Sequence, residues 1–121
     1  MKKKILVVDD EPEVVELVKN RLEDNNYEVI TANDGEEALY RANTEMPNLI
    51  ILDIMMPVID GYDVCARLKT DSKLCHIPIL MLTAKIKYND KKIAERYGAD
   101  AYIPKLYSSE MLLGQINKFL S

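Results

Sequence analysis

The chain has 121 residues, which is enough for one domain with a single hydrophobic core and too few for two. Its residues are 48% hydrophobic and 30% charged, a balance that excludes a disordered chain of low hydrophobicity. The formal net charge of -4 gives no basis for direct nucleic-acid binding, which is typical of basic surfaces. The first apolar run ends at Asp9, too early for a signal peptide, and no segment has transmembrane length. We therefore expect a cytoplasmic protein without a membrane segment.

Strand-like and helix-like segments alternate along the whole chain. Short apolar runs predict strands, and apolar residues spaced three or four apart predict helices. The expected strands are Lys4–Val8, Tyr27–Ala32, Asn48–Ile54, Ile77–Thr83 and Ala101–Pro104. The expected helices cover residues 11–25, the segment after Asp34, a stretch ending near Thr70, residues 89–97, and the segment after Ser108. Strands that are continuous apolar runs are buried on both faces, so we predict an α/β fold with a parallel sheet between two helical layers.

Local signals refine these elements. Pro12 suits the first turn of its helix, where a missing N–H costs nothing. Gly98 is expected as a left-handed C-cap and Ser108 as an N-cap. We expect Cys65 and Cys75 to be free thiols, since a reducing compartment disfavours disulfides. The buried stripe of the last helix is predicted to contain Met111, Leu112, Ile116, Phe119 and Leu120.

Reactive side chains follow four of the five predicted strands. The first strand ends in Asp9 and Asp10, the third in Asp53 and the fourth in Thr83, and the fifth runs into Lys105. In an open parallel sheet, ligands bind beyond the carboxyl ends of the strands, at the point where the strand order reverses. If the first and third strands are neighbours, as in the order 2-1-3-4-5, the three acids converge.

This set of side chains has a common chemical use. Three carboxylates held together repel one another, and a hard cation such as Mg²⁺ relieves the repulsion because it prefers oxygen ligands. Lys105 adds a positive charge for phosphate oxygens, and Thr83 adds a hydroxyl donor. A nucleophilic carboxylate, a metal ion, a cation and a hydroxyl are the groups that phosphoryl transfer requires.

Each of these residues also has a simpler interpretation. An acid at a strand end is more often a turn or N-cap residue, and the acids before Pro12 could complement the dipole of a helix. Thr83 alone could be a cap, and Lys105 alone a solvated side chain. Their joint placement at one sheet edge is what favours a site.

Six segments carry a family resemblance that covers the whole chain. They read ILVVDDE at 5–11, NDGEEAL at 33–39, PNLIILDIMMP at 47–57, DG at 60–61, LTA at 82–84 and GADAYIPK at 98–105. In this order and spacing they resemble the receiver domain of a two-component response regulator. The resemblance implies a flavodoxin-like (βα)5 fold with the strand order 2-1-3-4-5. It also implies a single receiver domain over residues 1–121, and we expect no output domain in this polypeptide.

The resemblance implies a role for each acid. Asp53 would accept a phosphoryl group from a phosphohistidine of a sensor histidine kinase or a histidine phosphotransfer protein. Asp10 and Asp53 would bind Mg²⁺ directly, together with the backbone carbonyl of Met55, and Asp9 would act through a water molecule. The protein would thus be a phosphorelay switch and not a turnover enzyme.

The resemblance also implies a switching surface. Lys105, Thr83 and Ala84 would lie at the phosphoryl group, and Tyr102 would move inward with Thr83. The change would remodel the face formed by the fourth helix, the fifth strand and the fifth helix. A downstream effector or output domain would read that face, and it is also where a homodimer could form.

Some positions depart from the family or leave alternatives open. Leu106 follows Lys105 where the family usually has a proline after a cis peptide, and a cis bond before a non-proline residue costs about 2.5–4 kcal/mol. A scaffold that has lost phosphorylation is one alternative, and a phosphohydrolase is another, although Met55 stands where its general acid would be. We also hypothesise that Met55 and Lys85 slow hydrolysis of the phosphoryl group. Gly61 is interpreted as a turn or cap residue.

Overall fold

A parallel five-stranded sheet lies at the centre of the protein in the computed structural model, which describes residues 2–54, 56, 58–83, 96, 98–104 and 109–120. The strand order is β2-β1-β3-β4-β5, and every neighbouring pair is parallel. This confirms the predicted flavodoxin-like fold. The strands are β1 (Lys4–Val8), β2 (Glu28–Ala32), β3 (Leu49–Asp53), β4 (Ile79–Thr83) and β5 (Ala101–Pro104). The helices are α1 (Pro12–Asp24), α2 (Gly35–Glu45), α3 (Gly61–Thr70) and α5 (Ser109–Leu120).

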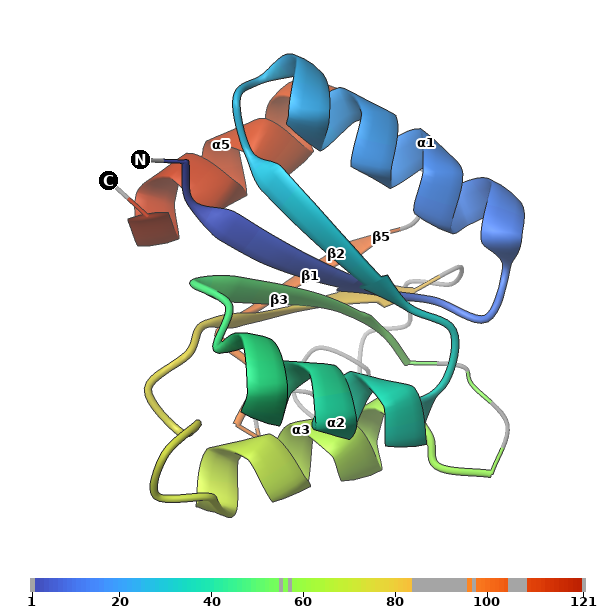
Figure 1. Ribbon diagram of the computed structural model, residues 1–121, viewed down its shortest axis with the longest axis vertical. Helices are drawn as coiled ribbons and strands as arrows, with labels where there is room; N and C mark the ends of the chain where they lie inside the picture. The colour runs from blue at the N-terminus through green and yellow to red at the C-terminus, as the bar shows by residue number, and fades with distance from the viewer. Residues whose placement is uncertain are drawn as a thin grey trace.

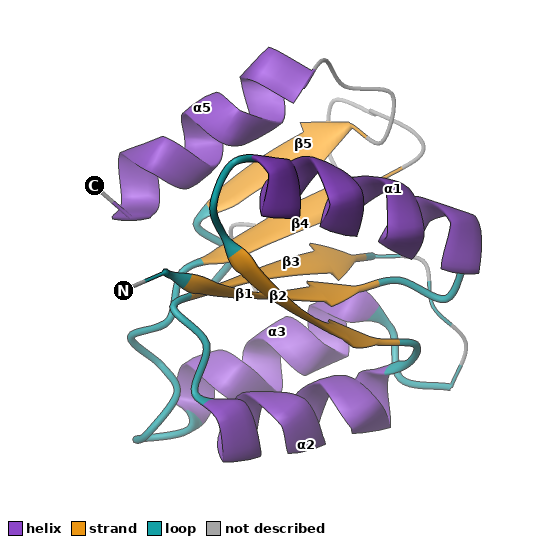
Figure 2. Ribbon diagram, turned by 45° about the horizontal axis from the view of Figure 1, so that its top comes forward, coloured by secondary structure: helices purple, strands orange, loops and turns teal. Residues whose placement is uncertain are grey.

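The helices form a layer on each face of the sheet. Figure 1 shows α1 and α5 on one face and α2 and α3 on the other, and Figure 2 shows the same arrangement with the sheet seen more openly. The ends of the chain lie close together at the edge where β1 begins, in both views. No helix among the described residues is long and apolar enough to cross a membrane.

The side chains of β3 alternate between the two faces and are all buried, as its continuous apolar run predicted. Ile50 and Leu52 belong to the core cluster beneath α2 and α3. Leu49 and Ile51 belong to the cluster beneath α1 and α5. Burying one such side chain contributes about 1.5–3 kcal/mol, so this strand anchors both halves of the core.

Helix starts follow local chemistry. Pro12 occupies the first turn of α1, as predicted. Asp34 caps α2 by accepting a hydrogen bond from the backbone N–H of Glu37 at 2.8 Å. Asp60 caps α3 in the same way, accepting from the N–H of Asp63 at 2.9 Å. The capped amino ends of α2 and α3 lie toward the carboxyl edge of the sheet, where the acids lie (Figure 2).

Three predicted strands begin later in the structure, at Glu28, Leu49 and Ile79, and β3 also ends one residue earlier, at Asp53. The N–H of Tyr27 donates to the carbonyl of Leu22 at the end of α1, so β2 starts at Glu28. The N–H of Ile77 donates to the carbonyl of Leu74 within a turn, so β4 starts at Ile79. For β2 and β4, a turn thus uses the N–H that the sheet would need.

The predicted stripe of the last helix was partly wrong. Leu112 and Ile116 are fully buried, but Met111 is 48% exposed. Consecutive residues of a helix point about 100° apart, so Met111 cannot share the direction of Leu112. Phe119 and Leu120 are half-buried against the same cluster.

The remaining local predictions divide between confirmed and untested. Gly98 has a φ of 92°, which confirms the left-handed conformation expected there, while the helix that it was predicted to cap lies almost wholly outside the described residues. Cys65 and Cys75 are both free thiols, as expected. The predicted cap at Ser108 lies outside the described residues. So does the predicted helix at 89–97, apart from Arg96, which is helical.

Candidate functional site

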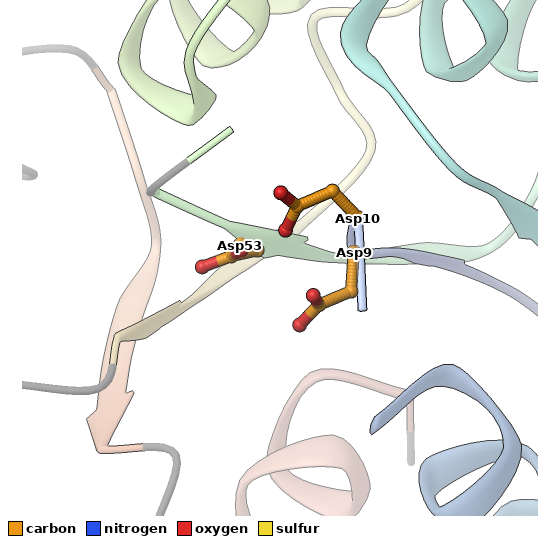
Figure 3. Close-up of side chains that lie close together, drawn as sticks. All are labelled: Asp9, Asp10 and Asp53. Carbon is orange, nitrogen blue, oxygen red and sulfur yellow. The ribbon is translucent and has the colours of Figure 1, made fainter. Parts of the chain in front are cut away.

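Three aspartates meet at the carboxyl edge of the sheet. Asp9 and Asp10 follow β1, and Asp53 ends β3. The two strands are neighbours, with Val8 paired to Leu52, so the acids are brought together as predicted. One carboxylate oxygen from each lies within 4.8 Å of the others, and Figure 3 shows the three side chains at the two strand ends.

The three carboxylates differ in their surroundings. Asp53 is 0% exposed and Asp9 is 1% exposed, whereas Asp10 is exposed. Asp9 and Asp10 point to opposite sides of the chain that leaves β1 (Figure 3). Burying two carboxylates side by side is costly unless other groups compensate for their charge.

Asp9 also forms the turn that leads into α1. Its Oδ1 accepts a hydrogen bond from the N–H of Glu11 at 2.9 Å. Its own N–H donates to the carbonyl of Ala32 at 3.2 Å, which joins the ends of β1 and β2. The simpler interpretation of Asp9 as a turn residue is therefore correct, and it coexists with membership of the acid cluster.

The donor set fits a hard divalent cation. Oxygen ligands from one or two carboxylates are what Mg²⁺ takes in proteins, and it keeps several of its waters. The cluster offers such oxygens within 4.8 Å of one another, with one exposed side chain on the solvent side. A divalent cation there would offset the like charges of Asp9, Asp10 and Asp53.

The other predicted site residues are only partly described. Thr83 is the last residue of β4, paired with Pro104 of β5, so its backbone lies at the same sheet edge. Tyr102 is half-buried on β5, paired with Met81, and packs against the core beneath α2 and α3. Met55, Ala84, Lys85, Lys105 and Leu106 lie outside the described residues. Their predicted roles remain predictions.

One contact at the site was not predicted. Gly61, the first residue of α3, lies directly against the backbone carbonyl of Asp53. The sequence motif suggested only a turn or cap at this glycine. A single sequence carries no signal for such an approach, because the contact depends on where α3 meets the sheet.

Comparisons with known proteins agree with this geometry. The family model "Response regulator receiver domain" matches residues 5–117. The chain is 48% identical over 120 residues to the "Alkaline phosphatase synthesis transcriptional regulatory protein PhoP" of Bacillus subtilis, covering 99% of this chain and 49% of that protein. It is 47% identical over 119 residues to the "Probable transcriptional regulator ycf27" of Cyanophora paradoxa, covering 98% of this chain and 48% of that protein. The chain thus spans about half the length of these curated relatives.

Solved structures agree as well. The chemotaxis protein CheY4 of Vibrio cholerae superimposes with a TM-score of 0.93 at 34% identity, over 99% of this chain and 100% of that one. A putative response regulator from Chloroflexus aurantiacus gives a TM-score of 0.95 at 33% identity, over 99% and 98% of the two chains. The family model, the relatives and the fold all lead to the same assignment. This chain belongs to the response regulator receiver domain family of two-component signalling.

Proposed function

We propose that Asp53 accepts a phosphoryl group in a reaction that requires Mg²⁺, and that the modified domain signals to a partner. The observation that supports this proposal best is the convergence of the Asp9, Asp10 and Asp53 carboxylates within 4.8 Å at the carboxyl edge of β1 and β3. Membership of the receiver family supports it independently.

Asp53 is the best acceptor among the three acids. It ends β3, which is hydrogen-bonded on both sides, to β1 and to β4. Asp9 already uses Oδ1 to hold the N–H of Glu11, and Asp10 is exposed beyond the strand end. A nucleophile in a fixed direction reacts faster than one on a mobile element, because its orientation is set before the donor arrives.

In the proposed reaction a carboxylate oxygen of Asp53 attacks the phosphorus of a phosphohistidine. A P–O bond forms, the P–N bond to the imidazole breaks, and the imidazole nitrogen takes up a proton. Asp10 and Asp53, with the backbone carbonyl of Met55, would hold Mg²⁺, and Asp9 would reach it through water. When bound, the ion neutralises charge on the phosphoryl oxygens. Lys105 would contact those oxygens as a further positive charge.

The signal would end when water attacks the phosphorus, which releases inorganic phosphate and restores the carboxylate. We therefore propose a phosphoprotein switch that assists its own phosphorylation and dephosphorylation, and not a turnover enzyme. Thr83 and Tyr102 would couple the phosphoryl group to the surface around β5, by biasing a two-state equilibrium.

The proposed partners are a sensor histidine kinase or a histidine phosphotransfer protein upstream, and an effector protein or output domain downstream. The relatives are described as transcriptional regulators, so control of transcription through such an output is a reasonable assignment. We propose that this domain itself does not bind nucleic acid, on the basis of its net charge of -4. The two free thiols are consistent with the cytoplasm as the place of the exchange.

The test is incubation with acetyl phosphate and Mg²⁺, followed by intact-mass measurement. We expect one added phosphoryl group in the wild type and none in Asp53→Asn. Asp63→Asn is the matched control, because Asp63 is an exposed acid near the start of α3 that is not in the cluster. No addition to the wild type with acetyl phosphate, phosphoramidate or a histidine kinase would refute the proposal. Equal addition to Asp53→Asn would refute the choice of acceptor.

A further inference from the structure

Gly61 leaves no room for a side chain next to the proposed acceptor. A Cβ atom built on Gly61 would lie 2.2 Å from the carbonyl oxygen of Asp53 and 2.7 Å from the Cα of Ile54. Both neighbours are backbone atoms, so no side-chain rotation can relieve the overlap. Any residue larger than glycine must push the Asp53 backbone away from α3.

Space, and not backbone conformation, is what requires glycine here. Gly98 is the one glycine among the described residues with a positive φ, so Gly61 adopts a conformation open to any residue. At the start of a helix, alanine would otherwise be the better helix former. The contact with Asp53 therefore explains why residue 61 is a glycine, which neither helix propensity nor φ explains.

The same contact closes the loop that follows the acceptor. The N–H of Gly61 donates to the carbonyl of Ile54 at 2.9 Å, and the N–H of Ile54 donates to the carbonyl of Leu82 on β4 at 3.1 Å. Asp53 is thus held between its paired residue on β4, Leu82, on one side and the first residue of α3 on the other. A shift of the acceptor requires one of these contacts to break.

A second glycine contacts the same loop farther from the acceptor. A Cβ atom on Gly35, at the start of α2, would lie 2.9 Å from the Cβ and from the carbonyl oxygen of Ile59. This contact is also tight, but the atoms nearest to it belong to Ile59 and Val64 and not to Asp53. Substitution of Gly35 should therefore affect the stability of the loop alone, whereas substitution of Gly61 should also affect the position of Asp53.

We propose that Gly61 is a positioning residue that sets where the Asp53 carboxylate lies relative to Asp9 and Asp10, an inference that rests on the proposed function of Asp53. Relieving the overlap to the usual minimum of 3.0 Å requires Gly61 and the Asp53 carbonyl to separate by 0.8 Å, the difference between 3.0 and 2.2 Å. A displacement of about 1 Å at a reacting group can lower a rate by roughly 100-fold. The same displacement changes the oxygen spacing that a metal ion requires.

The test compares Gly61→Ala with Gly35→Ala, both made in a Gly114→Ala background. A Cβ on Gly114, inside α5, meets nothing within 4 Å, so this change should add helix stability of about 1 kcal/mol far from the site. Two quantities are measured in each folded variant: the Mg²⁺ dissociation constant by calorimetry, and the phosphorylation rate as a function of acetyl phosphate concentration.

We expect Gly61→Ala to weaken Mg²⁺ binding and to lower the maximal rate at saturating donor, each by about 10-fold or more. Gly35→Ala should lose stability but keep both quantities within about 2-fold, because its contact is with Ile59. In NMR spectra, the Asp53 carbonyl carbon and the Ile54 amide should shift in Gly61→Ala and stay in place in Gly35→Ala. Equal effects of the two variants on Mg²⁺ affinity and maximal rate would overturn the inference.

The outcomes also separate this inference from the proposed function. A wild type that binds Mg²⁺ but takes up no phosphoryl group refutes the function, while the Mg²⁺ comparison still tests the positioning. If Gly61→Ala does not fold, the inference is tested in the wild type by the hydrogen-exchange rate of the Gly61 amide. We then expect the Gly61 N–H to be as protected as that of Leu52, and exchange as fast as in an exposed loop would overturn the inference.

Discussion

The ammonium nitrogen of Lys69 lies 2.9 Å from Oδ2 of Asp100, and this ion pair joins the last turns of α3 to the residue that precedes β5. The same Asp100 oxygen accepts a hydrogen bond from the N–H of Ile79 at 2.8 Å. Lys69 also donates to the carbonyl of Ile77 at 2.8 Å. The pair thus connects α3, the start of β4 and the start of β5 at the sheet edge opposite the acid cluster.

Removal of the Asp100 carboxylate should destabilise the fold. We expect Asp100→Ala to lower the free energy of unfolding by about 2 kcal/mol, because the Ile79 N–H and the Lys69 ammonium both lose an acceptor. Asp100→Asn keeps an acceptor oxygen and should cost about half as much. Urea unfolding measures both. Glu28→Ala is the control, since Glu28 is half-exposed and 3.8 Å from Lys4, and it should change stability by no more than about 0.5 kcal/mol.

Alkaline pH should destabilise the protein through Cys65. Burial raises the pKa of the Cys65 thiol from 9.0 to about 11, while Lys69 lowers it and Asp100 raises it to a smaller extent. Between about pH 9 and pH 11 the unfolded chain has lost the thiol proton that the folded chain keeps, so stability falls as the pH rises through this window. At full ionisation the loss is on the order of 2–3 kcal/mol.

The pH effect is measured as the free energy of unfolding at about pH 8 and about pH 11. Cys65→Ala should show a smaller decrease between these values than the wild type. Cys75→Ala should behave as the wild type does, because Cys75 is exposed. The same decrease in all three proteins would show that other groups cause it.

Replacing Val58 by a residue that tolerates its left-handed backbone conformation should stabilise the protein. Val58 is 98% exposed and has a φ of 69°, in the left-handed region that β-branched residues avoid. This conformation costs about 1–2 kcal/mol, and asparagine tolerates it well. We therefore expect Val58→Asn to raise the free energy of unfolding by about 1 kcal/mol. Val58→Thr is the control, because it keeps the β-branch and replaces one methyl group by a hydroxyl. An equal gain in Val58→Thr would show that loss of the exposed apolar group, and not the change in backbone conformation, causes the effect.

Mg²⁺ should stabilise the folded state through the acid cluster. At a concentration of 100 times the dissociation constant, binding adds about 2.7 kcal/mol. Asp10→Asn should lose most of this gain and should be more stable than the wild type without metal, because one of three neighbouring negative charges is removed. Asp63→Asn should keep the full gain. Thermal unfolding with and without Mg²⁺ gives the comparison, and equal gains in the wild type and Asp10→Asn would exclude the cluster as the binding site.

The sheet and the cluster of acids could be predicted because they depend on patterns within short segments. The apolar run of Leu49–Leu52 has to be buried on both faces, and an acid that follows such a run has to lie at the carboxyl edge. The cap at Asp34 follows from its side chain and the first turn of α2. Convergence of the acids needed one further assumption, that β1 and β3 are neighbours.

Other features depend on contacts between distant segments, and no local pattern signals them. Lys69 and Asp100 are far apart in the chain, and each alone is an ordinary charged residue. Gly61 resembles any glycine at a helix start until α3 is placed against Asp53. Met111 was wrongly assigned to the buried stripe because apolar character alone does not determine the rotation of a helix about its axis.

The two ends of the chain have a consequence for how this domain communicates. They lie at the edge of the sheet where β1 begins, whereas the acid cluster lies where β1 and β3 end (Figures 1 and 2). A strand of five residues is roughly 16 Å long, so a segment joined to the amino end starts at least about that far from the acids. The first residues of such a segment would lie too far from the acids to take part in the chemistry. A tag or fusion at either end should therefore leave the acid cluster accessible.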